Sequence, residues 1–270
     1  MNSEDLLDPV ARQTREPGTI PLAYDIAGSG PDLVFLHGLT FDRSSWQPII
    51  DRVAGDYRCT VIDLPGHGDS DGPPRPLDDI AAALHRLLGD LGIERPVVVG
   101  HSMGVALAAS YAAAYPVRGV VGIDQPLYVR PFGELVHSLA PALRGGGFKA
   151  AFEPFRQSIG VDRLPEPERS RIQARQRIDQ DLVLGYWDEL LRATPEQLQA
   201  RIDDTAAKIR APFLAVFGHT LDEQEKQHFR RLVRAAEIEE WPDRGHVLHL
   251  MEPDRFAARL ASFAGQCFQG

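Results

Sequence analysis

Val97 to Ala106 read VVVGHSMGVA, in which three valines are followed by two glycines that flank a serine. Consecutive β-branched residues are typical of a buried strand, and the alanine-rich segment after them is typical of a helix. Gly100 and Gly104 suit a sharp turn between the two, where larger side chains would collide with the adjoining strand and helix. The stretch therefore predicts a strand, a strained turn that exposes Ser102, and a helix.

The same alternation of short apolar runs and longer helical patterns extends over most of the chain. Such an alternation is typical of a mostly parallel β-sheet with helices on both faces, the α/β class. We expect strands at residues 33–36, 60–62, 97–99, 117–123, 213–217 and 238–241. We expect helices at residues 46–53, 77–91, 102–114, 223–233 and 253–263.

One long segment departs from this alternation. Residues 125–210 contain no strand-like run and have a polar, helical character. We interpret this segment as a helical cap inserted into a core made of residues 1–124 and 211–270. Within the cap, residues 144–147 read Arg-Gly-Gly-Gly and predict a flexible joint.

Composition and charge narrow the classes of function. The chain has 29 Lys and Arg residues against 38 Asp and Glu residues, a formal net charge of −9, which disfavours binding to nucleic acid or anionic lipid. Its two cysteines are too few for a disulfide framework and are expected to be reduced. Residues 1–15 lack the pattern of an export signal, and no apolar run approaches the ~20 residues of a membrane span. These features predict a cytoplasmic protein that acts on a small molecule.

An exposed serine in such a turn needs further groups to become a nucleophile. An imidazole must take its proton, and an acid must hold that imidazole in the correct tautomer. His246, in the sequence Asp243-Arg244-Gly245-His246, follows the last predicted strand and precedes the last predicted helix. A loop at this place in the chain can reach Ser102.

Four motifs together resemble the α/β-hydrolase family. They are the Gly100–Gly104 motif, His37-Gly38, the stretch DLPGHGDS at residues 63–70, and GHVLHLMEP at residues 245–253. The resemblance spans residues 21–263 apart from the cap. It implies a serine hydrolase in which Ser102 is the nucleophile, His246 rather than His249 is the base, and the amides of Leu39 and Met103 form the oxyanion hole.

The acid is where the sequence departs from the family pattern. In most relatives an aspartate stands three residues after a glycine that ends a strand, but in Gly218-His219-Thr220-Leu221-Asp222 the aspartate comes one residue late. Asp222 also suits the N-cap of the next predicted helix. Asp124, directly after the predicted strand before the cap, resembles the acid of other family members. We favour Asp124 as the acid and keep Asp222 as the alternative.

Three further residues have structural interpretations that outweigh functional ones. His67 lies in a turn that is structural in the family, and His249 is better explained by packing or pocket support. Trp46 suits the core better than an acyl pocket. His246 and His249 are three residues apart but have no third partner at a metal-binding spacing, so we expect neither a metal ion nor a cofactor.

The sequence as a whole predicts a hydrolase that cleaves a small or medium carboxylic ester or lactone through an acyl-enzyme. A carbon–carbon bond hydrolase or a thioesterase would use the same groups. An epoxide hydrolase or dehalogenase is disfavoured, because both resemble sites with an aspartate in place of Ser102. A ligand-binding receptor with slow turnover is the alternative from another class.

Overall fold

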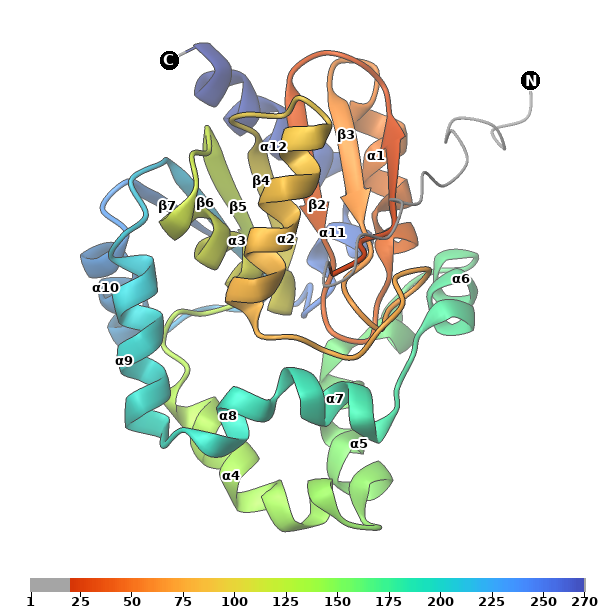
Figure 1. Ribbon diagram of the computed structural model, residues 1–270, viewed down its shortest axis with the longest axis vertical. Helices are drawn as coiled ribbons and strands as arrows, with labels where there is room; N and C mark the ends of the chain where they lie inside the picture. Colours follow the sequence, from red (N-terminus) through yellow and green to blue (C-terminus); the bar gives the residue numbers. More distant parts are fainter. Residues whose placement is uncertain (1–19, 270) are drawn as a thin grey trace.

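The computed structural model describes residues 20–269, whose core is a twisted β-sheet (Figure 1). Over this range the sheet has seven strands in the order β1-β3-β2-β4-β5-β6-β7. Strands β2 to β7 run parallel to one another, and β1 pairs antiparallel with β3. The predicted α/β class is confirmed. The strands are β1 (Tyr24–Ala27), β2 (Asp32–Leu36), β3 (Arg58–Ile62), β4 (Val97–His101), β5 (Gly119–Ile123), β6 (Phe213–Phe217) and β7 (Ala236–Glu240).

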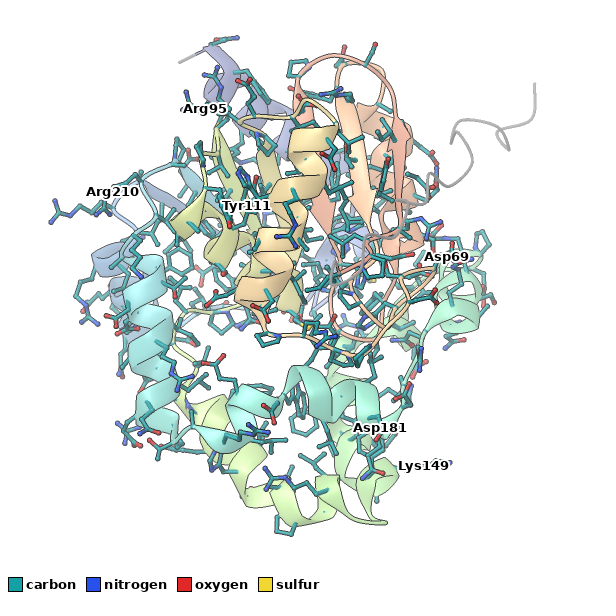
Figure 2. The ribbon with its side chains drawn as sticks, in the orientation of Figure 1. Asp69, Arg95, Tyr111, Lys149, Asp181 and Arg210 are labelled. Atoms are coloured by element: carbon teal, nitrogen blue, oxygen red, sulfur yellow. The ribbon has the colours of Figure 1, made fainter. Side chains whose placement is uncertain are left out.

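Helices cover both faces of the sheet, as expected for parallel strands that are buried on each side. Helices α2 (Leu77–Asp90), α3 (Met103–Ala114) and α10 (Glu223–Leu232) contribute to the apolar layer on one face. Tyr111 of α3, labelled in Figure 2, is fully buried in that layer. Helices α1 (Gln47–Val53) and α12 (Pro253–Gln269) pack on the other face. Two short helices, η1 (Arg43–Trp46) and α11 (Leu248–Met251), precede α1 and α12.

Within the described residues, β1 is the strand that the sequence did not predict. It has only four residues, and Asp25 interrupts its apolar pattern. The charge is tolerated because Arg43 pairs with Asp25, Asp63 and Asp69. Arg43 and Asp63 are both buried, so this ion network joins the edge strand to the end of β3 through side chains that have little contact with solvent.

A helical insertion, defined here as residues 125–210, leaves the sheet after β5 and returns at β6. Between those strands the chain forms six α-helices, all within the described range, and no strand. They lie together beyond one end of the sheet (Figure 1), where Figure 2 labels Lys149 and Asp181. The glycines at residues 145–147 connect the first two of these helices. The helices are α4 (Arg130–Arg144), α5 (Phe148–Ile159), α6 (Glu168–Arg175), α7 (Gln180–Tyr186), α8 (Asp188–Arg192) and α9 (Pro195–Ala206).

The helical insertion touches the loops that follow the carboxyl ends of the strands. Arg177 N donates to Thr40 O at 3.1 Å, after β2. Tyr186 Oη donates to Pro65 O at 2.8 Å, after β3. Ile172 packs in a small apolar cluster with Phe41, also after β2, and with Val247 after β7. The insertion is therefore fastened to several of the loops at the same edge of the sheet.

Two observations bear on the earlier expectations about the compartment. Both cysteines, Cys59 and Cys267, are free and buried. Among residues 20–269, no helix has the length and apolarity needed to cross a bilayer. The expectation about residues 1–15 falls outside the described part of the chain.

Candidate active site

Ser102 lies at a strained turn between β4 and α3. Its backbone angles are φ 52° and ψ −122°, a conformation that residues with a side chain rarely adopt. A Cβ atom on Gly100 would lie 2.3 Å from the carbonyl oxygen of Gly104, and one on Gly104 would lie 2.2 Å from that of Leu36. The turn therefore requires both glycines, for the steric reason that the sequence predicts.

Hydrogen bonds between neighbouring chain segments bring the end of β4 beside the end of β5. Ser102 N donates to Ile123 O at 2.9 Å, and Asp124 N donates to Val216 O at 2.8 Å. Ser102 and Asp124 each come directly after their strand, so they lie side by side at the carboxyl edge of the sheet. This is the edge where ligands bind in open parallel sheets.

The loop after β7 brings His246 to the same edge. His101, the residue before Ser102, donates from Nε2 to the carbonyl oxygen of His246 at 2.9 Å, and the two rings are 4.8 Å apart. Burial lowers the pKa of His101 well below its ordinary value, with further effects from His249 and His246. A neutral His101 thus holds the backbone of the loop, while the ring of His246 remains partly exposed.

Asp124 is the carboxylate that meets His246. His246 Nδ1 donates to Asp124 Oδ2 at 2.7 Å, and the side chain of Asp124 is only 7% exposed. Burial by itself raises the pKa of Asp124, but hydrogen bonds from His219, His246 and the Gly218 amide outweigh it and hold the pKa below its usual range. A buried anion on Nδ1 leaves Nε2 of His246 as the nitrogen that can accept a proton.

Asp222 has a different environment. Its side chain accepts the backbone N–H of Glu225 at 2.8 Å, and the Asp222 amide donates to Glu225 Oε2 at 3.0 Å. The pair forms a capping box at the start of α10. The structure thus supplies the helix-capping role that made Asp222 the weaker candidate in the sequence.

The amides expected to form an oxyanion hole are those of Met103 and Leu39. Met103 is the first residue of α3, so its N–H belongs to the turn whose donors have no partner within the helix. Gly38 packs against Ser102: a Cβ atom there would lie 3.2 Å from Ser102 Cβ. Leu39 follows immediately and is half-buried. The two backbone segments thus flank Ser102.

Two buried histidines support the loop that carries Leu39. His37 Nε2 accepts the Leu64 amide at 3.0 Å, and His67 Nε2 accepts the Thr40 amide at 3.3 Å. Burial lowers the pKa of His67 to about 3, so its ring is neutral and able to accept. Thr40 itself has a positive φ of 72°. His67 has the structural role expected from the sequence.

Trp46 and His249 belong to the core. Trp46 is fully buried against Phe35, with ring centroids 5.2 Å apart. His249 is also buried and packs 5.0 Å from the Trp46 ring and 4.7 Å from the His101 ring. Both therefore have the packing roles favoured by the sequence.

In the part of the chain that the structure describes, no group of three or more His, Cys, Asp or Glu side chains could hold a metal ion.

His219 is the residue near this site that sequence reasoning missed. Its Nδ1 lies 3.2 Å from Asp124 Oδ1, so Asp124 contacts two histidines. The signal was present in the order of the strands, because β5 and β6 are neighbours and residues just after Phe217 must meet residues just after Ile123. That order cannot be read from local sequence patterns.

Comparison with known proteins identifies the family of the chain. A family model described as the alpha/beta hydrolase family matches residues 33–259. The chain belongs to the alpha/beta hydrolase family. One similar family member is the 2-succinyl-6-hydroxy-2,4-cyclohexadiene-1-carboxylate synthase of Serratia proteamaculans, which is 29% identical over 86% of this chain and 92% of that protein.

Two solved structures show the same alpha/beta hydrolase fold at low sequence identity. A hydrolase from Pseudomonas aeruginosa PA01 superimposes with a TM-score of 0.76 and 18% identity, covering 98% of this chain and 100% of that one. An esterase from Thermogutta terrifontis superimposes with a TM-score of 0.69 and 22% identity, covering 96% and 99%. These likenesses extend across the sheet and the helical insertion.

Proposed function

We propose that this alpha/beta hydrolase cleaves a small or medium carboxylic ester or lactone, with Ser102, His246 and Asp124 as its catalytic triad. The observation that carries the proposal is the His246–Asp124 pair, held beside the strained Ser102 turn by the hydrogen bond from His101. A serine at a strained turn, an imidazole whose Nδ1 is bound by a carboxylate, and that buried carboxylate are the three groups that acyl transfer needs.

The reaction proceeds in two halves. His246 Nε2 takes the proton of Ser102 as Oγ attacks the acyl carbon, and the amides of Leu39 and Met103 bind the oxyanion. His246 then gives the proton to the departing alkoxide, which leaves as an alcohol, or stays tethered if the substrate is a lactone. Water attacks the acyl-enzyme and loses a proton to His246. His246 then donates that proton to Ser102 Oγ as the acyl–oxygen bond breaks, which releases the carboxylic acid and regenerates free Ser102.

The helical insertion supplies an apolar surface next to the oxyanion segment, and we assign it the role of a cap. Leu39 packs against its apolar cluster, which includes Phe155 and Trp187. Those two rings make an edge-to-face contact with centroids 5.2 Å apart. Both side chains are only half-buried, which suits residues that contact an apolar part of a substrate.

A panel of aryl esters, alkyl esters and lactones tests this proposal. The wild type, Ser102→Ala and a control with the exposed Ser138 changed to alanine are assayed in parallel. We expect turnover by the wild type and Ser138→Ala, and loss of turnover with correct folding in Ser102→Ala. A fluorophosphonate should label one serine per chain at Ser102. Labelling without turnover of any substrate would instead favour a slow receptor.

The relative from Serratia gives a reason to test a second reaction class. That protein is named as a synthase, and it aligns over most of its length with this chain. The same triad can serve a carbon–carbon bond hydrolase or a thioesterase. Thioesters and vinylogous diketones are therefore included in the panel. Higher kcat/KM for either class than for all esters and lactones would replace the ester assignment while keeping the triad.

A further inference from the structure

The two oxygens of the Asp124 carboxylate have separate partners. Oδ2 accepts His246 Nδ1 at 2.7 Å. Oδ1 accepts the amide of Gly218 at 2.7 Å and lies 3.2 Å from His219 Nδ1. One oxygen thus serves the proposed base, and the other is held by two consecutive residues of the loop after β6.

The backbone explains how His219 reaches this position. A Cβ atom on Gly218 would lie 1.9 Å from the carbonyl oxygen of Gly245, so only glycine lets the β6 end pass this close to the histidine loop. Gly218 N points at Asp124, and the chain then leads outward to His219, whose side chain is 49% exposed. His219 is therefore accessible to solvent while it contacts the buried carboxylate.

We propose that His219 is a positioning residue for the triad, which fixes the Asp124 carboxylate when neutral and weakens His246 as a base when protonated. This inference rests on the proposed function, because it assigns Asp124 and His246 their roles in acyl transfer.

The first effect is geometric. A neutral His219 with its proton on Nδ1 donates to Oδ1, as the Gly218 amide does. Two donors on one oxygen hold the plane of the carboxylate, so that the other oxygen stays directed at His246. The second donor is a side chain and can be removed without altering the backbone.

The second effect is electrostatic. Attack by Ser102 creates an imidazolium at His246, which the single negative charge of Asp124 stabilises. A protonated His219 places another positive charge on the same carboxylate and opposes formation of that imidazolium. Turnover is therefore highest when His219 is neutral.

The charges that face His219 favour its protonated form. They are Asp124 after β5, Glu225 of α10 and Glu240 of β7, and Glu240 is itself paired with Lys226 at 2.9 Å. The hydrogen bond to Asp124 is the largest effect and raises the pKa of His219 above its ordinary value, against partial burial.

The experiment compares the pH dependence of kcat/KM, on the best ester of the panel, for three variants and the wild type. His219→Asn keeps an N–H donor near the position of Nδ1 but does not titrate, and His219→Ala removes both properties. His85→Asn makes the same change at an exposed histidine of α2. We expect the acid limb of the wild type and of His85→Asn to be steeper than a single ionisation allows, and that of His219→Asn to follow one ionisation displaced to lower pH.

For His219→Ala we expect kcat on the plateau to fall about tenfold with little change in KM, the equivalent of one charge-assisted hydrogen bond. His219→Asn should restore most of that loss. A second readout is the NMR titration of His219 in the Ser102→Ala protein. The pKa of His219 should fall when Asp124→Asn is added to that protein.

Identical acid limbs in the wild type and His219→Asn, together with an unaltered kcat in His219→Ala, would overturn the inference. If Asp124→Asn is inactive in the same assays, the proposed function survives that result. If Ser102→Ala retains turnover, the triad is wrong and the role of His219 fails with it.

Discussion

His246 Nδ1 and Asp124 Oδ2 are 2.7 Å apart, although the helical insertion separates the two residues in sequence. The pair lies where the end of β5 meets the loop after β7, beside the residue that precedes Ser102. In the proposed triad the acid follows β5 and the histidine follows β7, which leaves the loop after β6 to bind the second oxygen of Asp124.

Replacement of Asp124 by asparagine should lower kcat by about four orders of magnitude, because the amide favours the wrong tautomer of His246. Asp222→Ala is the matched control. It should keep kcat near the wild-type value and lower the free energy of unfolding by about 1 kcal/mol, the cost of a lost N-cap. Steady-state kinetics and urea unfolding measure both effects. The reverse pattern would make Asp222 the acid.

Gly38→Ala should impair catalysis more than stability. The added methyl group would lie 2.9 Å from His101 Nδ1 and 3.2 Å from Ser102 Cβ, so it would push the Leu39 amide away from the nucleophile. We expect kcat to fall about a hundredfold, as for loss of an oxyanion donor. Gly89→Ala is a suitable control, since nothing lies within 4 Å of its added methyl group. Unchanged kcat in Gly38→Ala would argue against the oxyanion role of this loop.

Arg43→Leu should destabilise the protein by about 3–5 kcal/mol, the range for breaking a buried ion pair. The substitution leaves the carboxylate of Asp63, which is fully buried, without its main counter-charge. Urea unfolding measures the loss. Arg130→Leu, which removes an exposed pair with Glu134, should leave the free energy of unfolding almost unchanged. Similar losses in both variants would contradict the importance assigned to burial.

The stability of the protein should fall as the pH drops below about 6.5. Burial lowers the pKa of His249 to about 3, so between these values the unfolded chain binds a proton there that the folded chain does not. Stability contributed by neutral His249 is complete above the unfolded pKa and is lost on acidification. His249→Leu should reduce the dependence by about 1.4 kcal/mol per pH unit between pH 6 and 4, measured by urea unfolding. An unchanged slope would refute the assignment.

The sequence predicted the sheet class and the Ser102 turn because both depend on local constraints. Valine runs require burial, and the steric demands of a strand-to-helix turn exclude all but small residues at Gly100 and Gly104. His246 could be proposed from its place after the last strand. Strand β1 was missed because its pattern includes Asp25, whose partner Arg43 is distant in sequence.

The acid and its surroundings depended on contacts that local patterns do not report. Asp124 follows β5 directly, whereas Asp222 follows Gly218 beyond the end of β6, and the pairing of β5 with β6 together with the His246 contact of Asp124 distinguishes them. The same pairing places His219 on Asp124. Its role follows from a through-space neighbour, which the spacing in Gly218-His219-Thr220 does not reveal.

The helical insertion departs from β5 and rejoins the sheet at β6, two strands that are already neighbours in register. Its entry and exit are thus fixed by the core and do not depend on the length or path of the segment between them. An engineer could transplant a foreign lid between these two points and leave the pairing of the strands intact. A replacement segment would still need to supply a hydrogen-bond donor for the carbonyl oxygen of Thr40. In this protein the amide of Arg177 in the helical insertion is that donor.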